Sequence, residues 1–243
     1  MAAPARKSQY DKALLGLRSL ILNGEFEATA RLPETALADR LEISRTPLRQ
    51  AMDRLVEEGL LERVETGGCR VASFTIVDIT DAIEIRGVIE GTAARLAAER
   101  GADPSSLREC DHLVREIDVA LSNTRDIDFD AYVSLNAEFH RQLAMLARSP
   151  IVSREVERIM RLPLASPSAF LQGQQLIPDF AESLVRAQGQ HKAILEAIRN
   201  REGTRAEALG REHARLARQN LEYVMKSDHR LLAQVPGLAL VST

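Results

Sequence analysis

The sequence predicts a mainly α-helical protein with two domains: an N-terminal winged helix-turn-helix, with three helices and a β-hairpin wing, and a C-terminal all-α antiparallel helical bundle. Apolar residues recur at helical spacing along most of the chain. One stretch, 60–74, alternates like paired strands around a glycine turn. No strand pattern follows Phe74. We therefore expect the first domain to span 1–74 and the second to span 75–243.

Composition limits the class of protein. A chain of 243 residues with 45% apolar residues can bury a sizeable core. No stretch approaches the roughly 20 apolar residues of a membrane span, so we expect a cytoplasmic protein with no membrane partner. Two cysteines make no disulfide framework. The net charge of −3 does not exclude nucleic acid, because DNA binding needs a basic face rather than a basic total.

The first two helices are predicted from apolar spacing and from their end signals. In the first, apolar residues recur from Tyr10 to Ile21, and Asn23-Gly24 ends the run. The second opens at Pro33-Glu34 and is short; its apolar residues are Leu37, Ala38 and Leu41. Only a few residues separate it from the next helix, which is typical of a helix-turn-helix.

The third helix is expected to run from about Arg45 to Glu58. Ser44 can cap it by accepting a backbone N–H bond, and Pro47 is tolerated in its first turn. One stripe of the helix is apolar and consists of Leu48, Ala51, Met52 and Leu55. Another side of its first two turns is polar and carries Arg45, Thr46, Arg49 and Gln50. These donors are placed where a major groove of DNA could meet them.

The segment after this helix predicts a wing. Residues 60–65 and 69–74 alternate as two strands, with Thr66-Gly67-Gly68 as the tight turn between them. Taken alone, Arg45 and Arg49 fit an ordinary solvated helix face. Three helices, a tight turn and a glycine wing in this order favour DNA binding instead.

Residues 10–74 resemble the winged helix-turn-helix domain of the GntR family of bacterial transcription regulators. The matching segments are Ile21-Leu22-Asn23-Gly24, Arg31-Leu32-Pro33-Glu34, Leu37-Ala38, Ser44-Arg45-Thr46-Pro47-Leu48-Arg49 and Glu58-Gly59-Leu60. The resemblance implies that Arg45 and Arg49 contact base edges or phosphates and that the Gly67-Gly68 tip approaches the minor groove. We assign DNA contact to Ser44, Arg45, Thr46, Arg49, Gly67 and Gly68. Thr35 departs from the pattern, because some relatives carry a DNA-contacting arginine there.

The second domain is expected to contain only helices. The first runs from Asp78 to about Gly101, and Asp103-Pro104 then supplies a cap and a first-turn proline for the next. Further helices are predicted at about 105–122, 127–148, 151–162, 180–200 and 204–227. The segment 163–178, which contains three prolines and a glycine, is expected to be irregular or short-helical.

Four residues of the bundle form a candidate metal site. Asn136 and His140 lie four residues apart, on one face of a helix. His191 and His213 each lie 11 residues from Glu202, so an antiparallel hairpin would place both roughly 15 Å from its turn. Three imidazoles and the Asn136 carbonyl suit a divalent ion such as Zn²⁺ or Ni²⁺. The alternative is that each histidine lies singly, on the surface or in the core.

Residues 78 to about 225 resemble the FCD effector-binding domain of the FadR subfamily. The segments that carry the resemblance are Glu84-Ile85-Arg86-Gly87-Val88-Ile89-Glu90, Asn136-Ala137-Glu138-Phe139-His140, Gln190-His191-Lys192-Ala193-Ile194 and Glu212-His213. Many such domains bind a metal through three histidines and an Asp or Asn. The segment 81–91 is similar to the VanR branch, whose members answer to aromatic acids.

Arg86 is the candidate effector-binding residue. Its guanidinium could point into the bundle and bind a carboxylate with two parallel hydrogen bonds. An ion pair with Glu90, one helical turn later, is the alternative.

Together these patterns predict a cytoplasmic, homodimeric transcription regulator that acts as a repressor and binds a palindromic operator in double-stranded DNA. Its DNA binding is expected to be controlled by a small carboxylate effector bound at a metal ion in the helical bundle. A metal-dependent enzyme of small organic acids fused to a DNA-binding domain is the main alternative. A constitutive, ligand-free DNA-binding protein is the other.

Overall fold

The computed structural model describes residues 8–123, 126–161, 165–167, 180–226 and 238–241. The chain divides into two compact units, Met1–Ile76 with Pro236–Thr243 and Val77–Val235. The border between them follows Ile76, whereas the sequence alone placed it after Phe74. The described residues 238–241 group with the first unit, whereas the sequence assigned all of 75–243 to the second.

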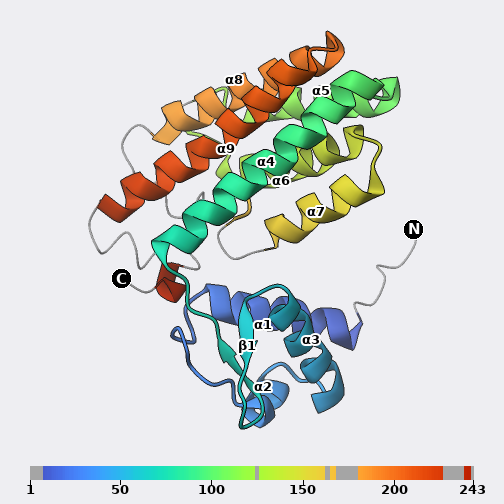
Figure 1. Ribbon diagram of the computed structural model, residues 1–243. Coiled ribbons are helices and arrows are strands. Elements are labelled where there is room, and N and C mark those ends of the chain that lie inside the picture. The colour runs from blue at the N-terminus through green and yellow to red at the C-terminus, as the bar shows by residue number, and fades with distance from the viewer. Residues whose placement is uncertain (1–7, 124–125, 162–164, 168–179, 227–237, 242–243) are drawn as a thin grey trace, which may run out of the picture. The chain divides into compact units, whose positions relative to one another are not determined.

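Among the described residues, the first unit combines three α-helices, one short 3-10 helix and a two-stranded sheet (Figure 1). Its described elements are α1 (Gln9–Leu22), α2 (Glu34–Arg40), α3 (Arg45–Glu57), β1 (Leu61–Arg63), β2 (Cys69–Val71) and the 3-10 helix η2 (Leu238–Leu240). The strands pair antiparallel, with Glu62 opposite Arg70. They are shorter than predicted, because a turn begins directly after β1. In this turn the backbone N–H of Val64 donates to the carbonyl of Gly68, and that of Gly67 donates to the carbonyl of Val64. After β2, the backbone of Phe74 donates to the carbonyl of Leu240, near the chain end, at 2.9 Å.

The core of this unit joins all its helices to the wing. The stripe predicted for α3, from Leu48 to Leu55, is the buried one. It packs with Leu17 and Ile21 of α1 and with residues of both strands, and Leu240 joins the same cluster.

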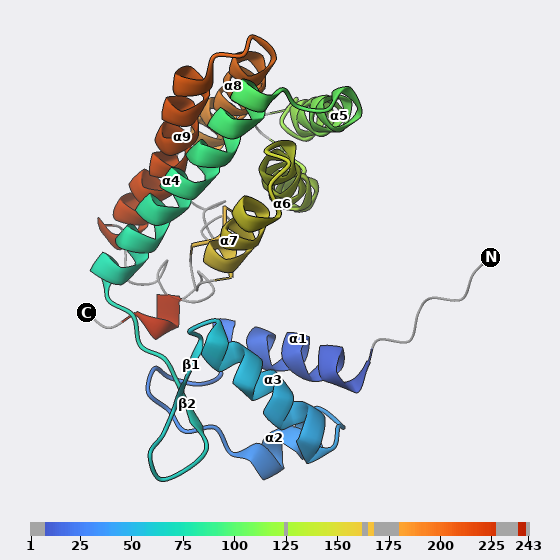
Figure 2. The same cartoon turned by 45° about the vertical axis from the view of Figure 1, so that its right-hand side comes forward.

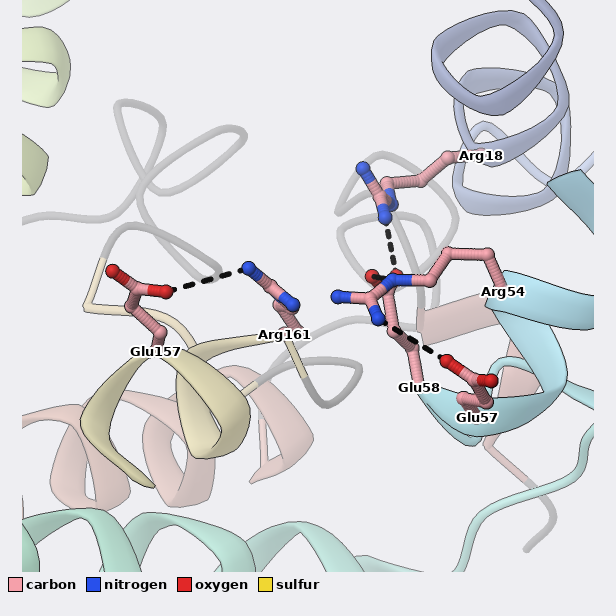
Figure 3. Close-up of polar contacts among 6 residues, drawn as sticks. All are labelled: Arg18, Arg54, Glu57, Glu58, Glu157 and Arg161. Carbon is pink, nitrogen blue, oxygen red and sulfur yellow. Dashed lines mark hydrogen bonds and ion pairs between the residues drawn. The ribbon is translucent and has the colours of Figure 1, made fainter. Parts of the chain in front are cut away.

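A buried carboxylate ties α1 to the end of α3. Glu58 is almost fully buried and lies between two arginines, as Figure 3 shows. Arg18 of α1 forms an ion pair with it, and Arg54 of α3 donates to it through Nε at 2.9 Å. A buried carboxylate needs this compensation, because leaving it unpaired would be strongly destabilising.

The second unit is a helical bundle, as predicted. Its helices are α4 (Ile76–Arg100), α5 (Pro104–Ala120), α6 (Phe129–Leu146), α7 (Pro150–Met160), α8 (Phe180–Arg199) and α9 (Gly203–Lys226). Asp103 caps α5 as expected, accepting the backbone N–H groups of Ser105 and Ser106 at 2.9 and 3.0 Å. Most of the predicted irregular segment 163–178 lies outside the described residues. No helix within the described part of the chain is both long and apolar enough to cross a membrane.

Close contact between α4 and α9 depends on small residues. The two helices lie side by side in Figures 1 and 2. A Cβ at Gly91 would meet the backbone oxygen of Glu207 at 2.8 Å, and one at Gly87 would meet the Cβ of Ala214 at 2.8 Å. Since α9 carries His213, this contact also sets the position of one candidate metal ligand.

We therefore expect Gly91→Ala to destabilise the bundle by about 1–3 kcal/mol, because the backbone of α9 must move to admit a methyl group. Gly189→Ala in α8 is the matched control: a Cβ there meets nothing within 4 Å. That change should stabilise the protein by about 0.5–1 kcal/mol through helix propensity. The melting temperature should therefore fall in Gly91→Ala and rise in Gly189→Ala. Equal changes of melting temperature in the two variants would contradict close packing at Gly91.

Candidate functional site

The residues predicted to contact DNA lie exposed on α3 and on the wing. Ser44, Arg45, Thr46 and Arg49 are all exposed. Ser44 occupies the N-cap position, but its side chain makes no capping hydrogen bond, so the predicted cap mechanism is wrong. The carbonyl of Ser44 accepts the first bond of the helix, from the backbone N–H of Leu48 at 3.5 Å.

Arg49 has an acidic neighbour that the sequence did not reveal. Its Nε donates to Oε2 of Glu34 in α2 at 2.8 Å, while 62% of the Arg49 side chain stays exposed. The hydrogen bond and the charge of Glu34 raise the pKa of Arg49. Arg49 therefore remains charged and accessible at the start of the helix.

The wing tip needs glycine. Gly67 and Gly68 have φ angles of +94° and +79°, in the left-handed region that other residues rarely adopt. A Cβ at either would meet nothing within 4 Å, so the tip is open enough for a close approach to another molecule. The side chain of Arg31 donates to the hydroxyl of Thr66 beside it.

Three buried histidines from three helices converge in the bundle. His140 lies on α6, His191 on α8 and His213 on α9. The Nε2 atom of His213 lies 3.1 Å from that of His191 and 3.2 Å from that of His140. Two nitrogens bound to one tetrahedral zinc ion at about 2.05 Å would lie about 3.3 Å apart. The spacing therefore fits a metal, and the cluster could hold one.

The opposite nitrogen of each ring contacts a side-chain oxygen. Nδ1 of His140 lies 2.8 Å from Glu90, that of His191 lies 3.0 Å from Gln188, and that of His213 lies 3.1 Å from Gln190. Because Glu90 only accepts hydrogen bonds when ionised, Nδ1 of His140 carries the proton. The amide of Gln188 is oriented by bonds from its nitrogen to Val114 and Asp118 at 2.7 and 3.0 Å.

This arrangement turns the lone pairs of three imidazoles toward one point. Neutral Nε2 atoms cannot hydrogen-bond to one another without a proton between them, whereas a cation satisfies all three. Burial and the neighbouring His140 lower the pKa of His213 to about 3, and burial with the other two rings lowers that of His191 well below its ordinary value. Burial raises the pKa of Glu90, but His140 and Arg86 have the opposite and larger effect, and the pKa of Glu90 is lowered to about 2.

Arg86 and Asn136 lie beside this cluster. Both line a cavity of about 40 Å³ together with His213. Arg86 is fully buried: its Nη1 donates to the carbonyl of Ala165 at 2.8 Å, and its Nε lies 3.5 Å from Glu90. The ion pair offered as the alternative role of Arg86 is therefore present. Yet Nε has no hydrogen-bond partner among the described residues, so it can still donate to a bound molecule.

The residues that orient the rings were not predicted from the sequence. Glu90 was considered only as an ion-pair partner of Arg86, although it also contacts His140. Gln188 lies one turn before His191, a spacing that could have suggested the contact. Gln190 contacts a histidine 23 residues away, for which the sequence contains no local signal.

We expect Gln190→Ala to weaken zinc binding by about 10- to 100-fold, because His213 loses the acceptor that orients its ring. Gln190 is only half-buried, so the bundle should fold normally. Isothermal titration with zinc measures the effect, and Gln219→Ala, an exposed position on α9, is the control. Equal zinc affinity in both variants would show that the contact of Gln190 is incidental.

Comparison with known proteins covers both units. An FCD domain model matches residues 81–216, and the model for bacterial regulatory proteins of the gntR family matches residues 9–71. The uncharacterized HTH-type transcriptional regulator YdhC of Bacillus subtilis is 30% identical over 59% of this chain, a match that spans 62% of that protein's own length. The Glc operon transcriptional activator of Escherichia coli is 24% identical over 92% of this chain and 93% of its own.

Two further proteins are similar over most of the chain. The HTH-type transcriptional repressor GlaR of Escherichia coli is 25% identical over 81% of this chain and 88% of its own. The solved structure described as E. coli McbR/YncC superposes with a TM-score of 0.64 at 20% identity and covers 91% of this chain and 99% of that one. That structure supports the fold alone.

Proposed function

We propose that this chain, which belongs to the gntR family of bacterial regulatory proteins and carries an FCD domain, is a repressor whose operator binding is controlled by a small organic acid held at a metal ion. It is a DNA-binding transcriptional regulator and not an enzyme, since the family matches and the printed names of its relatives are those of regulators. The observation that carries the proposal is the convergence of three buried imidazoles beside a cavity lined by Arg86.

In the DNA-binding half, α3 enters the major groove and the wing tip approaches the minor groove. The exposure of Ser44, Arg45, Thr46 and Arg49 supports this role. The ion pair of Arg49 with Glu34 is no obstacle, because exposed pairs contribute little and readily exchange for another acceptor. The open tip at Gly67 and Gly68 supports the second contact.

Two copies of the chain bind one operator. A winged helix-turn-helix reads a half-site, and a homodimer places two recognition helices one helical turn apart on a palindrome. Light scattering should give twice the chain mass of 26.9 kDa. Binding-site selection from random DNA should return an inverted repeat.

In the bundle, His140, His191 and His213 hold the metal ion, with the Asn136 carbonyl as a weaker oxygen donor. Zinc and nickel both suit this nitrogen-rich set. The metal supplies a Lewis-acid anchor for a carboxylate oxygen. Arg86 binds the same carboxylate through Nε, which makes no hydrogen bond to any described residue although it lies 3.5 Å from Glu90. The acid controls DNA binding by favouring one of two conformations of the dimer.

The test begins with elemental analysis of the native protein and mass spectrometry of any acid that co-purifies. Binding-site selection then supplies an operator, and a reporter gene behind it gives the sign of control. The proposal expects about one transition-metal ion per chain and a reporter that is repressed until the acid is added. Relatives named as activator and as repressor make the reporter informative. If the native protein contains no metal and no acid changes its affinity for the operator, the proposal is wrong and the chain is a constitutive DNA-binding protein.

A further inference from the structure

The cavity beside the histidines extends along the hairpin of α8 and α9. On α9 it is lined by His213, Leu216, Ala217 and Asn220, and on α8 by Ala187, Leu184 and Ser183. These residues follow one another in steps of one or three, so they mark one side of each helix. From His213 to Asn220 the helix rises about 10 Å. The cavity therefore has two ends, one at the metal ligands and the other two helical turns away.

The two ends differ in chemistry. The end near the histidines contains Arg86, the one ionised side chain among the described residues that line the cavity. The middle is apolar and is formed by Leu184, Ala187, Leu216 and Ala217. The far end carries neutral polar groups: the hydroxyl of Ser183 donates to Oδ1 of Asn220 at 3.0 Å.

This hydrogen bond fixes which groups remain available. Because Oδ1 of Asn220 accepts from Ser183, the amide nitrogen of Asn220 is the end of the side chain left to donate. The hydroxyl oxygen of Ser183 keeps its lone pairs. The pair can thus both donate to an oxygen and accept from a hydroxyl. It offers no positive charge, so a carboxylate placed there would lose its hydration without compensation.

We infer that Ser183 and Asn220 recognise a neutral hydroxyl or carbonyl oxygen of an acid whose carboxylate is bound at Arg86. The effector class is then a short-chain hydroxy or oxo monocarboxylic acid rather than a dicarboxylic or unsubstituted acid. This inference rests on the proposed function, because it requires that an organic acid binds in the cavity. Ser183 and Asn220 set the specificity of the site, while Arg86 and the histidines set its affinity for carboxylates in general.

The test uses the zinc-loaded, full-length protein and isothermal titration with three series of straight-chain acids of about three to eight carbons. The series are unsubstituted monocarboxylates, ω-hydroxy monocarboxylates and α,ω-dicarboxylates. At the best chain length, the hydroxy acid should bind about tenfold tighter than the other two, the effect of one well-made hydrogen bond. In Asn220→Leu that preference should disappear, while affinity for the unsubstituted acid stays within about threefold.

Three further proteins make the outcome decisive. Ser183→Ala, a smaller change, should reduce the preference, because the amide of Asn220 loses the donor that orients it. Gln219→Leu, at the neighbouring exposed position, should leave it unchanged. Arg86→Met should weaken all three series alike. A hydroxyl preference that survives in Asn220→Leu, or a wild-type protein that binds dicarboxylates best, would overturn the inference alone. A wild-type protein that binds no acid would overturn the effector role in the proposed function as well.

Discussion

Replacing His191 and His213 together by alanine is expected to abolish metal binding while DNA binding by the first unit persists. The change removes two of the three converging imidazoles. The loss of zinc affinity should therefore exceed the 10- to 100-fold that is typical when a residue hydrogen-bonded to a metal ligand is replaced. Both Nε2 atoms face the common point, and burial keeps both rings neutral at pH 7. Zinc content by elemental analysis and the zinc-induced rise in melting temperature should both fall to background, since only a ligand that binds the folded state stabilises it.

Two comparisons guard this result against a folding defect. His112→Ala removes an exposed histidine on α5 and should keep full zinc content. If the double variant proves unstable, the conservative change His213→Gln takes its place in the test. This variant retains a polar side chain and should still lose most of its zinc affinity. Stoichiometric zinc and a normal zinc-induced shift in the double variant would show that these histidines only stabilise the bundle.

Arg49→Ala is expected to lower operator affinity by roughly 5- to 150-fold, the range for loss of one bidentate base contact. Affinity for scrambled DNA should fall much less, because phosphate contacts by other arginines remain. The variant should fold normally, since the Arg49 side chain is 62% exposed. Fluorescence anisotropy with labelled operator and scrambled duplexes measures both constants at one salt concentration.

The neighbouring acid requires a second variant. With Arg49 removed, Glu34 stands unpaired close to DNA phosphates, and repulsion could mimic a lost contact. Glu34→Gln combined with Arg49→Ala removes this charge and should retain most of the loss. Arg158→Ala, which removes a well-exposed arginine of α7, controls for net charge. Unchanged operator affinity in Arg49→Ala would assign this arginine to an ordinary solvated face.

The helices and the meeting of the histidines were predictable because local signals specify them. Apolar spacing and end residues such as Asn23-Gly24 and Asp103-Pro104 locate each helix within a few residues. The register of His191 and His213 follows from counting outward from one short turn, and the structure brings their Nε2 atoms to 3.1 Å. A short hairpin leaves little freedom of register, so sequence distance converts directly into height.

Contacts between residues distant in the chain were not predictable. Glu34 pairs with Arg49, and Glu90 with His140, across separate helices. The sequence pattern is equally compatible with either glutamate facing solvent. Leu240 belongs to the core of the first unit although it is about 170 residues from the strands it packs with, and no local pattern predicts a contact over such a sequence distance. Ser44 has the extended backbone of an N-cap residue, yet its side chain makes no cap bond. The residue type alone does not fix the side-chain rotamer on which such a bond depends.

The central claim is that an acid held at the metal of the bundle changes the affinity of the first unit for DNA. It is tested most directly by measuring operator affinity in four states: protein loaded with zinc or stripped by a chelator, each with and without the co-purified acid or, failing one, the tightest-binding acid of the titration. We expect the acid to shift the operator dissociation constant by about 5- to 150-fold in the zinc-loaded protein and by less than about twofold in the stripped protein. An equal shift in both, or none in either, would contradict the account.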